Sequence, residues 1–427
     1  MKPLSRRRFL AGAAGIGVAA GASAAGATLL GGCSSPRVHP AGPTPGRSPA
    51  AATPSESRPG VLVLLALYGG NDGLNTLIPY ADPAYLGARP SLGYQPGQVI
   101  RLDAELALHP ALTQLKGLWD AKQLAIVRGV GYPDPNYSHF RSMDIWQSGV
   151  PDRDEPTGWL GRYLDRTGGK DPLWALSLGP TMPPLLQGAS VAGSALPSGN
   201  LTIAPAIEPP FTALMTPAAG ASPLLQRVAA SGADLLTVVH AVREVLSAQT
   251  APAGGTNLEG GPPSSTARTA AAATGLDAQL DVVARLIVGG LPTRVYVVSF
   301  GGFDTHGTEK DTLANLLAEL DSAVGAFAKA VAGHPVVLMT FSEFGRRVAE
   351  NASGGTDHGS AAPLFVVGSG VKGGYYGDEP GLTDLDDGNL RFTTDFRSVY
   401  ATVAEGVLGV DQGAVLEGGS FPTLGFV

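Results

Sequence analysis

Residues 295–341 read VYVVSFGGFDTHGTEKDTLANLLAELDSAVGAFAKAVAGHPVVLMTF, and this stretch decides the fold. The runs Val295–Phe300 and Val336–Phe341 are almost continuously apolar, which is typical of strands buried on both faces of a sheet. Apolar side chains between the two runs recur every three or four residues and predict an amphipathic helix. These positions are Leu313, Leu316, Leu317, Leu320, Val324, Phe327 and Val331. A strand, a helix and a second strand in this order predict two parallel strands.

The same alternation continues on both sides of this unit. Four more apolar runs predict strands at Val61–Ala66, Leu124–Val127, Trp174–Leu178 and Leu364–Val367. A second helix is indicated where Leu276, Leu280, Val283 and Ile287 repeat. We therefore expect an α/β fold with a mostly parallel central sheet and helices on both faces. In such sheets ligands bind at the carboxyl ends of the strands.

Acidic and imidazole side chains gather where these strands end. Glycine-flanked loops carry Asp304 and His306 in GGFDTH, and Asp357 and His358 in GTDHG. Mixed Asp and His ligands suit a divalent ion such as zinc or manganese, and glycine lets the backbone turn closely around it. Asp72 in GGNDG follows the first predicted strand, and Glu343 in SEFGR follows Val336–Phe341. The sequence thus predicts one metal site formed by six residues: Asp72, Asp304, His306, Glu343, Asp357 and His358.

For each of these positions there is a simpler explanation than metal binding. Asp304 and His306 are two residues apart, so an extended loop places both on one side, but Asp304 is equally suited to cap a turn. Asp357 and His358 are adjacent and diverge, which fits two ions, or one ligand with an orienting partner, or an Asx turn. For Asp72, turn formation alone explains the residue type.

Two further alternatives concern side chains near the ends of the predicted strands. Glu343 is followed by Arg346 and Arg347, so a surface ion pair of little energetic value is the alternative to a metal ligand. The segment YSHFRSMDIW predicts a helix start with Ser138 near its N-cap. A nucleophilic Ser138, with Arg141 holding non-reacting oxygens, is one interpretation, and a purely capping serine is the other. His139 is either an additional ligand or a packed core residue.

The N-terminal residues predict export. Ser5–Leu10 carries three consecutive arginines and precedes an Ala/Gly-rich apolar stretch, which is typical of a twin-arginine signal. The run LGGC ends at Cys33, the single cysteine, and resembles a lipobox, so we expect lipidation of Cys33 rather than a chance thiol. The chain then divides into a signal at 1–33, a Pro/Ala/Ser-rich linker at 34–59 and an α/β domain at 60–427. A second low-complexity segment, about 251–275, predicts a surface excursion.

Charge excludes one class of partner. The chain has 29 basic and 36 acidic residues and a formal net charge of −7. Removal of residues 1–32 takes away Lys2, Arg6, Arg7 and Arg8 and no acids, leaving 25 basic residues and a net charge of −11. Binding of DNA or RNA requires a basic face, so we expect no nucleic-acid partner. Neither a GxSxG nucleophile motif nor a GxGxxG loop followed by a helix is present.

Several motifs together resemble the family known as domain of unknown function 1501. They are the twin-arginine start, GGNDGLNT, SHFRSMDIW, GGFDTH, SEFGR, TDHG, PLFVVGSGVKGG and TDFRSVYATV, spread over 60–427. That family is similar to the alkaline phosphatase and sulfatase superfamily, whose members bind one or two divalent metals at the carboxyl edge of a parallel sheet. By this resemblance Asp72 matches a first-strand ligand, Ser138 the nucleophile, and Asp304 and His306 a ligand pair.

The resemblance leaves the last loop open. In one alignment Asp357 and His358 match an Asp-His ligand pair. In a second alignment His358 matches the final ligand histidine, and Glu343 stands in the place of the pair. In the second alignment Phe344 stands where a histidine is expected, which supports one metal better than two.

The resemblance implies an exported, lipid-anchored hydrolase of phosphate or sulfate esters with one or two divalent ions (zinc, manganese or calcium). Its expected partners are a small-molecule or polymer ester, the twin-arginine translocase and the membrane at Cys33. The expected location is the periplasm or the outer face of the cytoplasmic membrane. The alternative is a non-catalytic cell-envelope binding or assembly protein with the same fold.

Overall fold

The centre of the molecule is a mixed sheet with strand order β11-β5-β10-β9-β1-β8-β6-β7, in which β14 also pairs with β5. The computed structural model describes residues 60–167, 171–196, 203–249 and 275–427. The predicted signal, the linker and nearly all of the 251–275 excursion lie outside the described residues. The described residues form one compact unit.

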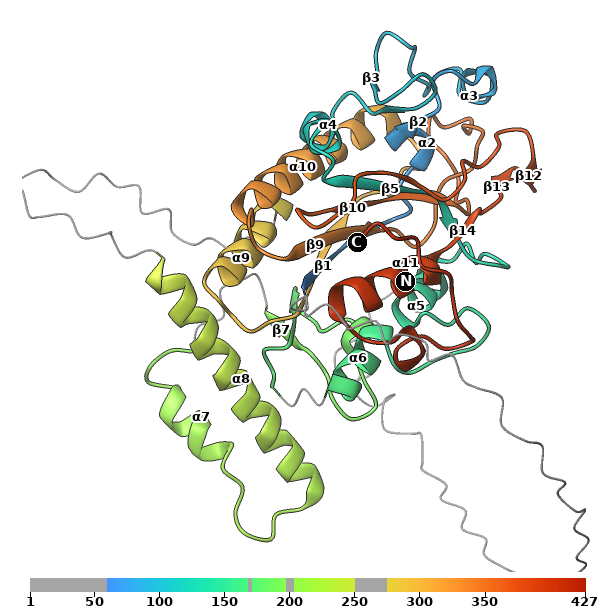
Figure 1. The fold of residues 1–427 in the computed structure, drawn as a ribbon. Helices are drawn as coiled ribbons and strands as arrows, with labels where there is room; N and C mark the ends of the chain where they lie inside the picture. Colours follow the sequence, from blue (N-terminus) through green and yellow to red (C-terminus); the bar gives the residue numbers. More distant parts are fainter. Residues whose placement is uncertain (1–59, 168–170, 197–202, 250–274) are drawn as a thin grey trace, which may run out of the picture. The chain divides into compact units, whose positions relative to one another are not determined.

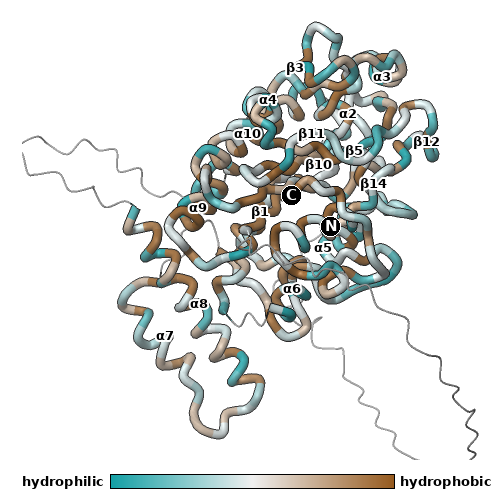
Figure 2. The backbone as a smooth tube through the Cα atoms, in the orientation of Figure 1, coloured by the Kyte–Doolittle hydropathy of each residue, from teal (hydrophilic) through white to brown (hydrophobic). Residues whose placement is uncertain are grey.

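All six predicted strands are present in this sheet. They are β1 (Val61–Tyr68), β5 (Leu124–Gly131), β6 (Ala175–Leu178), β8 (Val295–Gly301), β9 (Val336–Phe341) and β10 (Ala362–Val367). Shorter strands complete it: β7 (Ser194–Leu196), β11 (Gly374–Tyr376) and β14 (Thr394–Asp395). The central strands β1 and β9 consist almost entirely of buried residues, as their continuous apolar sequences predict, and Figure 2 shows the strands at the centre as hydrophobic.

Most strand pairs are parallel, and β10 is the exception. β1 pairs in parallel with β8 and with β9, and β6 pairs in parallel with β8. β10 instead runs antiparallel to both β5 and β9. No helix connects β9 to β10, so the chain turns at the carboxyl edge and re-enters the sheet from that same edge. As a result, the loop between β9 and β10 stays at the edge where β1 and β8 end.

Helices cover both faces of the sheet, as expected (Figure 1). One apolar cluster packs α4 (Thr113–Asp120), α9 (Leu276–Val288) and α10 (Glu309–Ala330) against the sheet, together with part of α8 (Pro223–Ala248). A second cluster on the opposite face includes α5 (His139–Ser148), α6 (Trp159–Thr167) and α11 (Phe396–Val403). The predicted helices around 276–287 and 313–331 are therefore confirmed.

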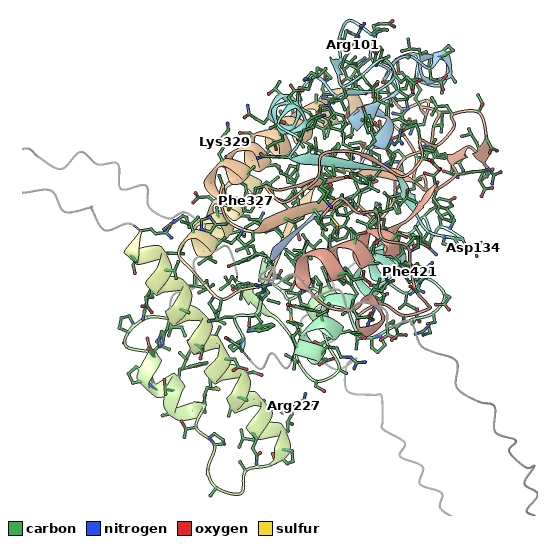
Figure 3. The ribbon with its side chains drawn as sticks, viewed as in Figure 1. Arg101, Asp134, Arg227, Phe327, Lys329 and Phe421 are labelled. Carbon is green, nitrogen blue, oxygen red and sulfur yellow. The ribbon has the colours of Figure 1, made fainter. Side chains whose placement is uncertain are left out.

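Helix α10 shows how the apolar periodicity sets its orientation. Phe327 is 3% exposed and packs in the first cluster, whereas Lys329, two residues later, is exposed. Figure 3 shows Lys329 on the outer side of α10. Burying one large apolar side chain of this kind stabilises the fold by roughly 1.5–3 kcal/mol.

The remaining elements are short or peripheral. A three-stranded sheet has the order β2-β4-β3, and β12 pairs with β13. Their bounds are β2 (Leu77–Ile78), β3 (Ile100–Arg101), β4 (Ala107–Leu108), β12 (Leu385–Asp386) and β13 (Asn389–Leu390). The other helical segments are α2 (Gly73–Thr76), α3 (Pro83–Ala88), η1 (Pro184–Leu186), α7 (Glu208–Leu214), η3 (Ala404–Leu408) and η4 (Gln412–Ala414). Within the described residues, no helix is both long enough and apolar enough to cross a membrane.

Candidate metal centre

The loops that follow β1, β8 and β9 meet at one edge of the sheet. Gly69, just after β1, has a φ of +120°, and a Cβ at this position would lie 2.3 Å from the amide nitrogen of Asp304. Glycine is therefore required here both by its backbone angle and by the close approach of the loop after β8. The first loop thus supports the second, which carries Asp304.

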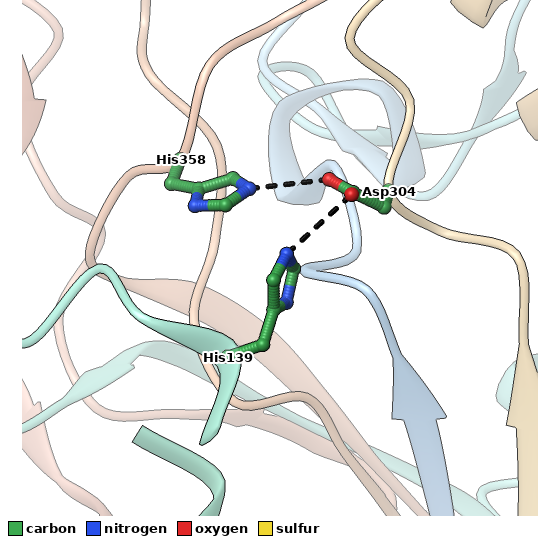
Figure 4. Close-up of side chains that lie close together, drawn as sticks. All are labelled: His139, Asp304 and His358. Carbon is green, nitrogen blue, oxygen red and sulfur yellow. Dashed lines mark hydrogen bonds and ion pairs between the residues drawn. The ribbon is translucent and has the colours of Figure 1, made fainter. Parts of the chain in front are cut away.

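Three side chains from distant parts of the sequence converge at this edge (Figure 4). His139 begins α5, Asp304 follows β8, and His358 precedes β10. Nε2 of His139 lies 3.5 Å from Oδ2 of Asp304, and Nε2 of His358 lies 3.1 Å from Oδ1 of Asp304. One nitrogen or oxygen atom from each residue falls within 4.8 Å of the others. These three residues are called the His-Asp-His cluster below.

A hydrogen-bond acceptor holds Nδ1 of each histidine in the cluster. Nδ1 of His139 lies 2.8 Å from the Glu343 carboxylate, and Nδ1 of His358 lies 2.8 Å from the backbone carbonyl oxygen of Tyr137. A carboxylate and a carbonyl oxygen can only accept, so each Nδ1 carries a hydrogen and donates it. In the neutral rings Nε2 then carries a lone pair directed at Asp304. This pattern, with one ring nitrogen held by an acceptor, is typical of metal-ligating histidines.

His306 adds a third imidazole beside the cluster. Its Nε2 lies 2.9 Å from Nε2 of His358 and 3.1 Å from Oδ1 of Asp304. Its Nδ1 lies 3.2 Å from Oδ1 of Asp357. Asp357 therefore orients His306, while the Tyr137 carbonyl orients His358. The adjacent Asp357 and His358 diverge, as their spacing predicts.

The donor set fits a divalent cation. Lone pairs of neutral Nε2 atoms repel a facing carboxylate unless a positive charge lies between them, and either a proton on the ring or a divalent ion supplies that charge. Two or three imidazole nitrogens with one carboxylate oxygen form a set that zinc commonly takes, with a position left for water or substrate. The side chain of Asp304 is 49% exposed, that of His139 32% and that of His358 20%, so the cluster opens to solvent.

Arg346 fixes the loop that carries Asp304. Its guanidinium is fully buried and donates to the backbone carbonyls of Gly69, Gly70, Phe303 and Thr356, and to Oδ1 of Asp304 at 2.9 Å. Burial alone would raise the pKa of Asp304, but the hydrogen bond and the charge of Arg346 lower it to about 2. The sequence-based alternative of a surface ion pair for Glu343 is wrong, because Glu343 and Arg346 are each 1% exposed and Glu343 contacts His139 and Gly69.

Asp72 lies at the same edge but pairs with an arginine. Its carboxylate forms a fully buried ion pair with Arg89, whose guanidinium also donates to the carbonyls of Val348 and Arg347. Oδ1 of Asp72 and Oε1 of the buried Glu309 both lack a hydrogen-bond partner among the described residues. A proton on Glu309 shared with Asp72 accounts for both atoms.

The pKa values of this buried pair agree with a shared proton. Burial and the charge of Asp72 raise the pKa of Glu309 to about 9, and Thr356 donates to its other oxygen at 2.6 Å. Burial opposes ionisation of Asp72, but the charge of Arg89 and the hydrogen bond with Glu309 lower its pKa. At neutral pH, Asp72 is ionised and Glu309 is protonated. The partners of Asp72 are thus Arg89 and Glu309, and it is not one of the three residues of the cluster.

Ser138 lies between two residues that contact the cluster. Tyr137 holds His358 and His139 belongs to the cluster, whereas Ser138 is the N-cap of α5 and its side chain makes no capping hydrogen bond. Its hydroxyl is exposed, and it has no hydrogen-bond partner among the described residues. Arg141 is directed elsewhere, since it pairs with Asp154 at 2.8 Å and donates to the Arg153 carbonyl. His139 and Arg141 are two positions apart on α5, so their side chains project in nearly opposite directions.

Of four further residues at this edge, Arg89 and Glu309 have no role that the sequence predicts, Arg346 is expected in a surface ion pair, and Phe344 is noted only as standing where a histidine is expected. Phe344 is 3% exposed, and its ring centre lies 5.0 Å from that of His139 and 4.6 Å from that of His358. It forms an apolar wall where the resemblance expected another histidine. The run SEFGRR contains two of the four residues, and its position at the end of a buried strand was the available signal.

Residues 214–414 match the model of the family described as Protein of unknown function (DUF1501). The match confirms over this range the resemblance that the motifs indicate, and the DUF1501 range contains Asp304, Glu343 and His358. Among curated proteins no sequence relative matches the chain.

The chain aligns at low sequence identity with solved structures, including the three that follow. The C-terminal periplasmic domain of EcEptC from Escherichia coli, in complex with Zn, is 8% identical with a TM-score of 0.36, and covers 73% of this chain and 74% of that one. A protein in the alkaline phosphatase superfamily from Vibrio parahaemolyticus is 11% identical with a TM-score of 0.35, covering 76% and 64%. Phosphonate monoester hydrolase of Agrobacterium radiobacter is 12% identical with a TM-score of 0.36, covering 82% and 74%.

Proposed function

We propose that this protein is an exported, lipid-anchored, metal-dependent hydrolase of phosphate or sulfate esters. The observation that supports this proposal most is the convergence of the Nε2 atoms of His139 and His358 on the Asp304 carboxylate, with each Nδ1 held by an acceptor. Two imidazoles that share one solvent-open carboxylate, with each Nδ1 already held by an acceptor, form the arrangement that is typical of metal-ligating histidines.

His139, Asp304 and His358 would hold the metal, and His306 is close enough to join them. When bound, a divalent ion would stabilise negative charge on the ester oxygens. The imidazole-rich set favours zinc or manganese over calcium, because calcium prefers oxygen ligands. Phe344 occupies space beside both imidazoles and favours a single metal.

Ser138 is the proposed nucleophile, because its exposed hydroxyl lies at the start of α5 between two residues that contact the cluster. Its Oγ would give up its proton and bond to phosphorus or sulfur as the bond to the alcohol oxygen breaks, and that oxygen would leave with the electron pair and take up a proton. Water would then cleave the serine ester and release phosphate or sulfate. The N-terminus of α5 favours the anionic group that Ser138 attacks.

A second candidate is a non-catalytic cell-envelope binding or assembly protein, and one observation favours it. Arg89 and Arg346 place buried guanidinium groups against Asp72 and Asp304, so protein cations already neutralise part of the acidic charge at this edge. Such a protein would keep the cluster for at most a structural metal.

Export and anchoring remain proposals that rest on the N-terminal sequence. The twin-arginine translocase would carry the folded chain, and lipidated Cys33 would attach it to the periplasmic membrane surface. The 34–59 linker would connect the anchor to the α/β domain.

The two candidates differ in metal content and turnover. We expect the purified protein to contain about one metal per chain and to hydrolyse an aryl phosphate or an aryl sulfate. Ser138→Ala should abolish hydrolysis while the metal is retained. Ser222→Ala, which changes the capping serine of the distant helix α8, is the matched control and should leave both unchanged. Bound metal without turnover of either ester would favour the second candidate.

A further inference from the structure

A hollow of about 420 Å³ opens near the carboxyl ends of β1, β8 and β6. Its lining includes Tyr68 at the end of β1, Ser299 in β8, Ser177 in β6 and the 179–184 loop that follows β6. Its volume lies in the range of about 300–1,000 Å³ that is usual for small-molecule sites.

The hollow and the metal centre share the end of β1. Tyr68 lines the hollow, and the amide of the next residue, Gly69, donates to Glu343 at 2.8 Å, which in turn holds His139. Ser299 and Ser177 follow on the two neighbouring strands, since β8 pairs with β1 and β6 pairs with β8. The hollow therefore lies along the same edge of the sheet as the cluster, and Tyr68 is the lining residue that adjoins it in sequence.

Four hydroxyl groups of the hollow are available for hydrogen bonds. Tyr68, Ser177, Thr181 and Ser299 all line it, and none of these hydroxyls has a hydrogen-bond partner among the described residues. A hydroxyl both donates and accepts, as does the alcohol of a sugar or polyol. A guest that covers these hydroxyls without bonding to them leaves buried polar groups unsatisfied, which weakens its binding.

The rest of the lining is uncharged and stiff. It contains no Asp, Glu, Lys, Arg or His. Burying an unpaired charge is costly, so the lining disfavours ionised guests. Leu178 and Met182 supply apolar surface, and Pro180, Pro183 and Pro184 restrict the backbone of the wall.

We propose that this hollow receives the alcohol part of the substrate, and that this part is an uncharged, hydroxyl-rich group such as a sugar or polyol. The proposal rests on the proposed ester hydrolysis for its biological role. The hollow itself binds the neutral group through the hydroxyls of Ser177, Ser299, Tyr68 and Thr181.

The kinetic test compares three esters of whichever acid, phosphate or sulfate, the full chain hydrolyses. The kcat/KM for the glucose 6-ester should exceed that for the charged serine O-ester by at least about 10-fold. In the double variant Ser177→Ala/Ser299→Ala, which loses two hydrogen bonds of about 1 kcal/mol each, kcat/KM for the glucose ester should fall roughly 10-fold or more. Hydrolysis of the 4-nitrophenyl ester should change less than about two-fold. Equal losses for all three esters would overturn the proposal.

A binding test separates this proposal from the proposed reaction. Saturation-transfer NMR with methyl glucoside should show transfer from the wild type and from Asp304→Asn, and little from the double variant. Tyr80→Phe removes a hydroxyl that bonds the Asp103 carbonyl elsewhere, and should behave as the wild type. Glucoside binding without hydrolysis of any ester would contradict the proposed function alone. Hydrolysis without glucoside binding would contradict the hollow's role alone.

Discussion

The carboxylate of Glu343 lies 2.8 Å from Nδ1 of His139 and accepts the amide hydrogen of Gly69 at 2.8 Å. One buried side chain after β9 therefore joins the end of β1 to the first residue of α5. Because the hydrogen bond fixes which nitrogen of His139 carries the proton, Glu343 sets the lone pair of Nε2 toward Asp304. Glu343 is better described as the residue that orients a ligand than as a member of the cluster.

Glu343→Gln should weaken metal binding while leaving the fold intact. The amide can still accept from Gly69 but holds His139 less firmly, and the loss of such an orienting partner typically costs 10–100-fold in affinity. Competition with a chromophoric chelator measures the change. Glu208→Gln is the matched control. Glu208 also pairs with a histidine, His240, at 2.8 Å, but neither residue belongs to the metal centre. Unchanged affinity in Glu343→Gln would contradict the role of the Glu343 carboxylate in orienting His139.

Arg346→Lys should destabilise the protein by roughly 2–5 kcal/mol, because an ammonium group cannot replace a planar guanidinium that bonds four carbonyls and Asp304. Chemical denaturation measures the loss. Arg391→Lys alters an exposed arginine that pairs with Asp384, and should change stability by less than about 1 kcal/mol. Similar effects of the two substitutions would contradict the role given to Arg346.

Glu309→Gln should remove part of the pH dependence of stability. The pKa of Glu309 is raised from 4.5 to about 9, so the folded chain keeps a proton that the unfolded chain releases above about pH 4.5. Its contribution is present below the unfolded pKa and is lost as pH rises toward 9. Glutamine can donate to Asp72 and accept from Thr356 at every pH, so Tm should fall less between pH 6 and 9 in the variant. Parallel Tm curves for both proteins would refute the shared proton.

Arg141→Ala should leave both the metal content and the Michaelis constant for an aryl ester nearly unchanged. Arg141 pairs with Asp154, whose side chain is 98% exposed, and exposed ion pairs contribute about 0–1 kcal/mol. Steady-state kinetics check this expectation. If the Michaelis constant instead rises about 10-fold or more, the result would support the role that the sequence predicts, in which Arg141 holds substrate oxygens.

The strands could be predicted because strands buried on both faces have almost continuously apolar sequences, as in Val336–Phe341. The direction of β10 could not, since it depends on a connection at 342–361 that contains no helix. This reversal brings His358 to the same edge as Asp304.

The site was predicted best where side chains directly flank buried strands. Asp304, Glu343 and His358 do so, and the structure brings them together. The partners of Asp72 could not be foreseen, because Arg89 is 17 residues away on a separate segment and no local pattern links the two. The burial of Arg346 was missed for a similar reason, since adjacent arginines usually indicate a solvated surface.

The most direct test of the central claim is the metal content of the purified full chain, measured by elemental analysis after dialysis. We predict about one zinc or manganese ion per chain in the wild type and in the control His240→Ala. Asp304→Asn and His358→Ala should each lose most of the metal while keeping the circular dichroism spectrum of the wild type. A wild type that binds no divalent metal when zinc or manganese is supplied, or variants that keep it fully, would contradict the account.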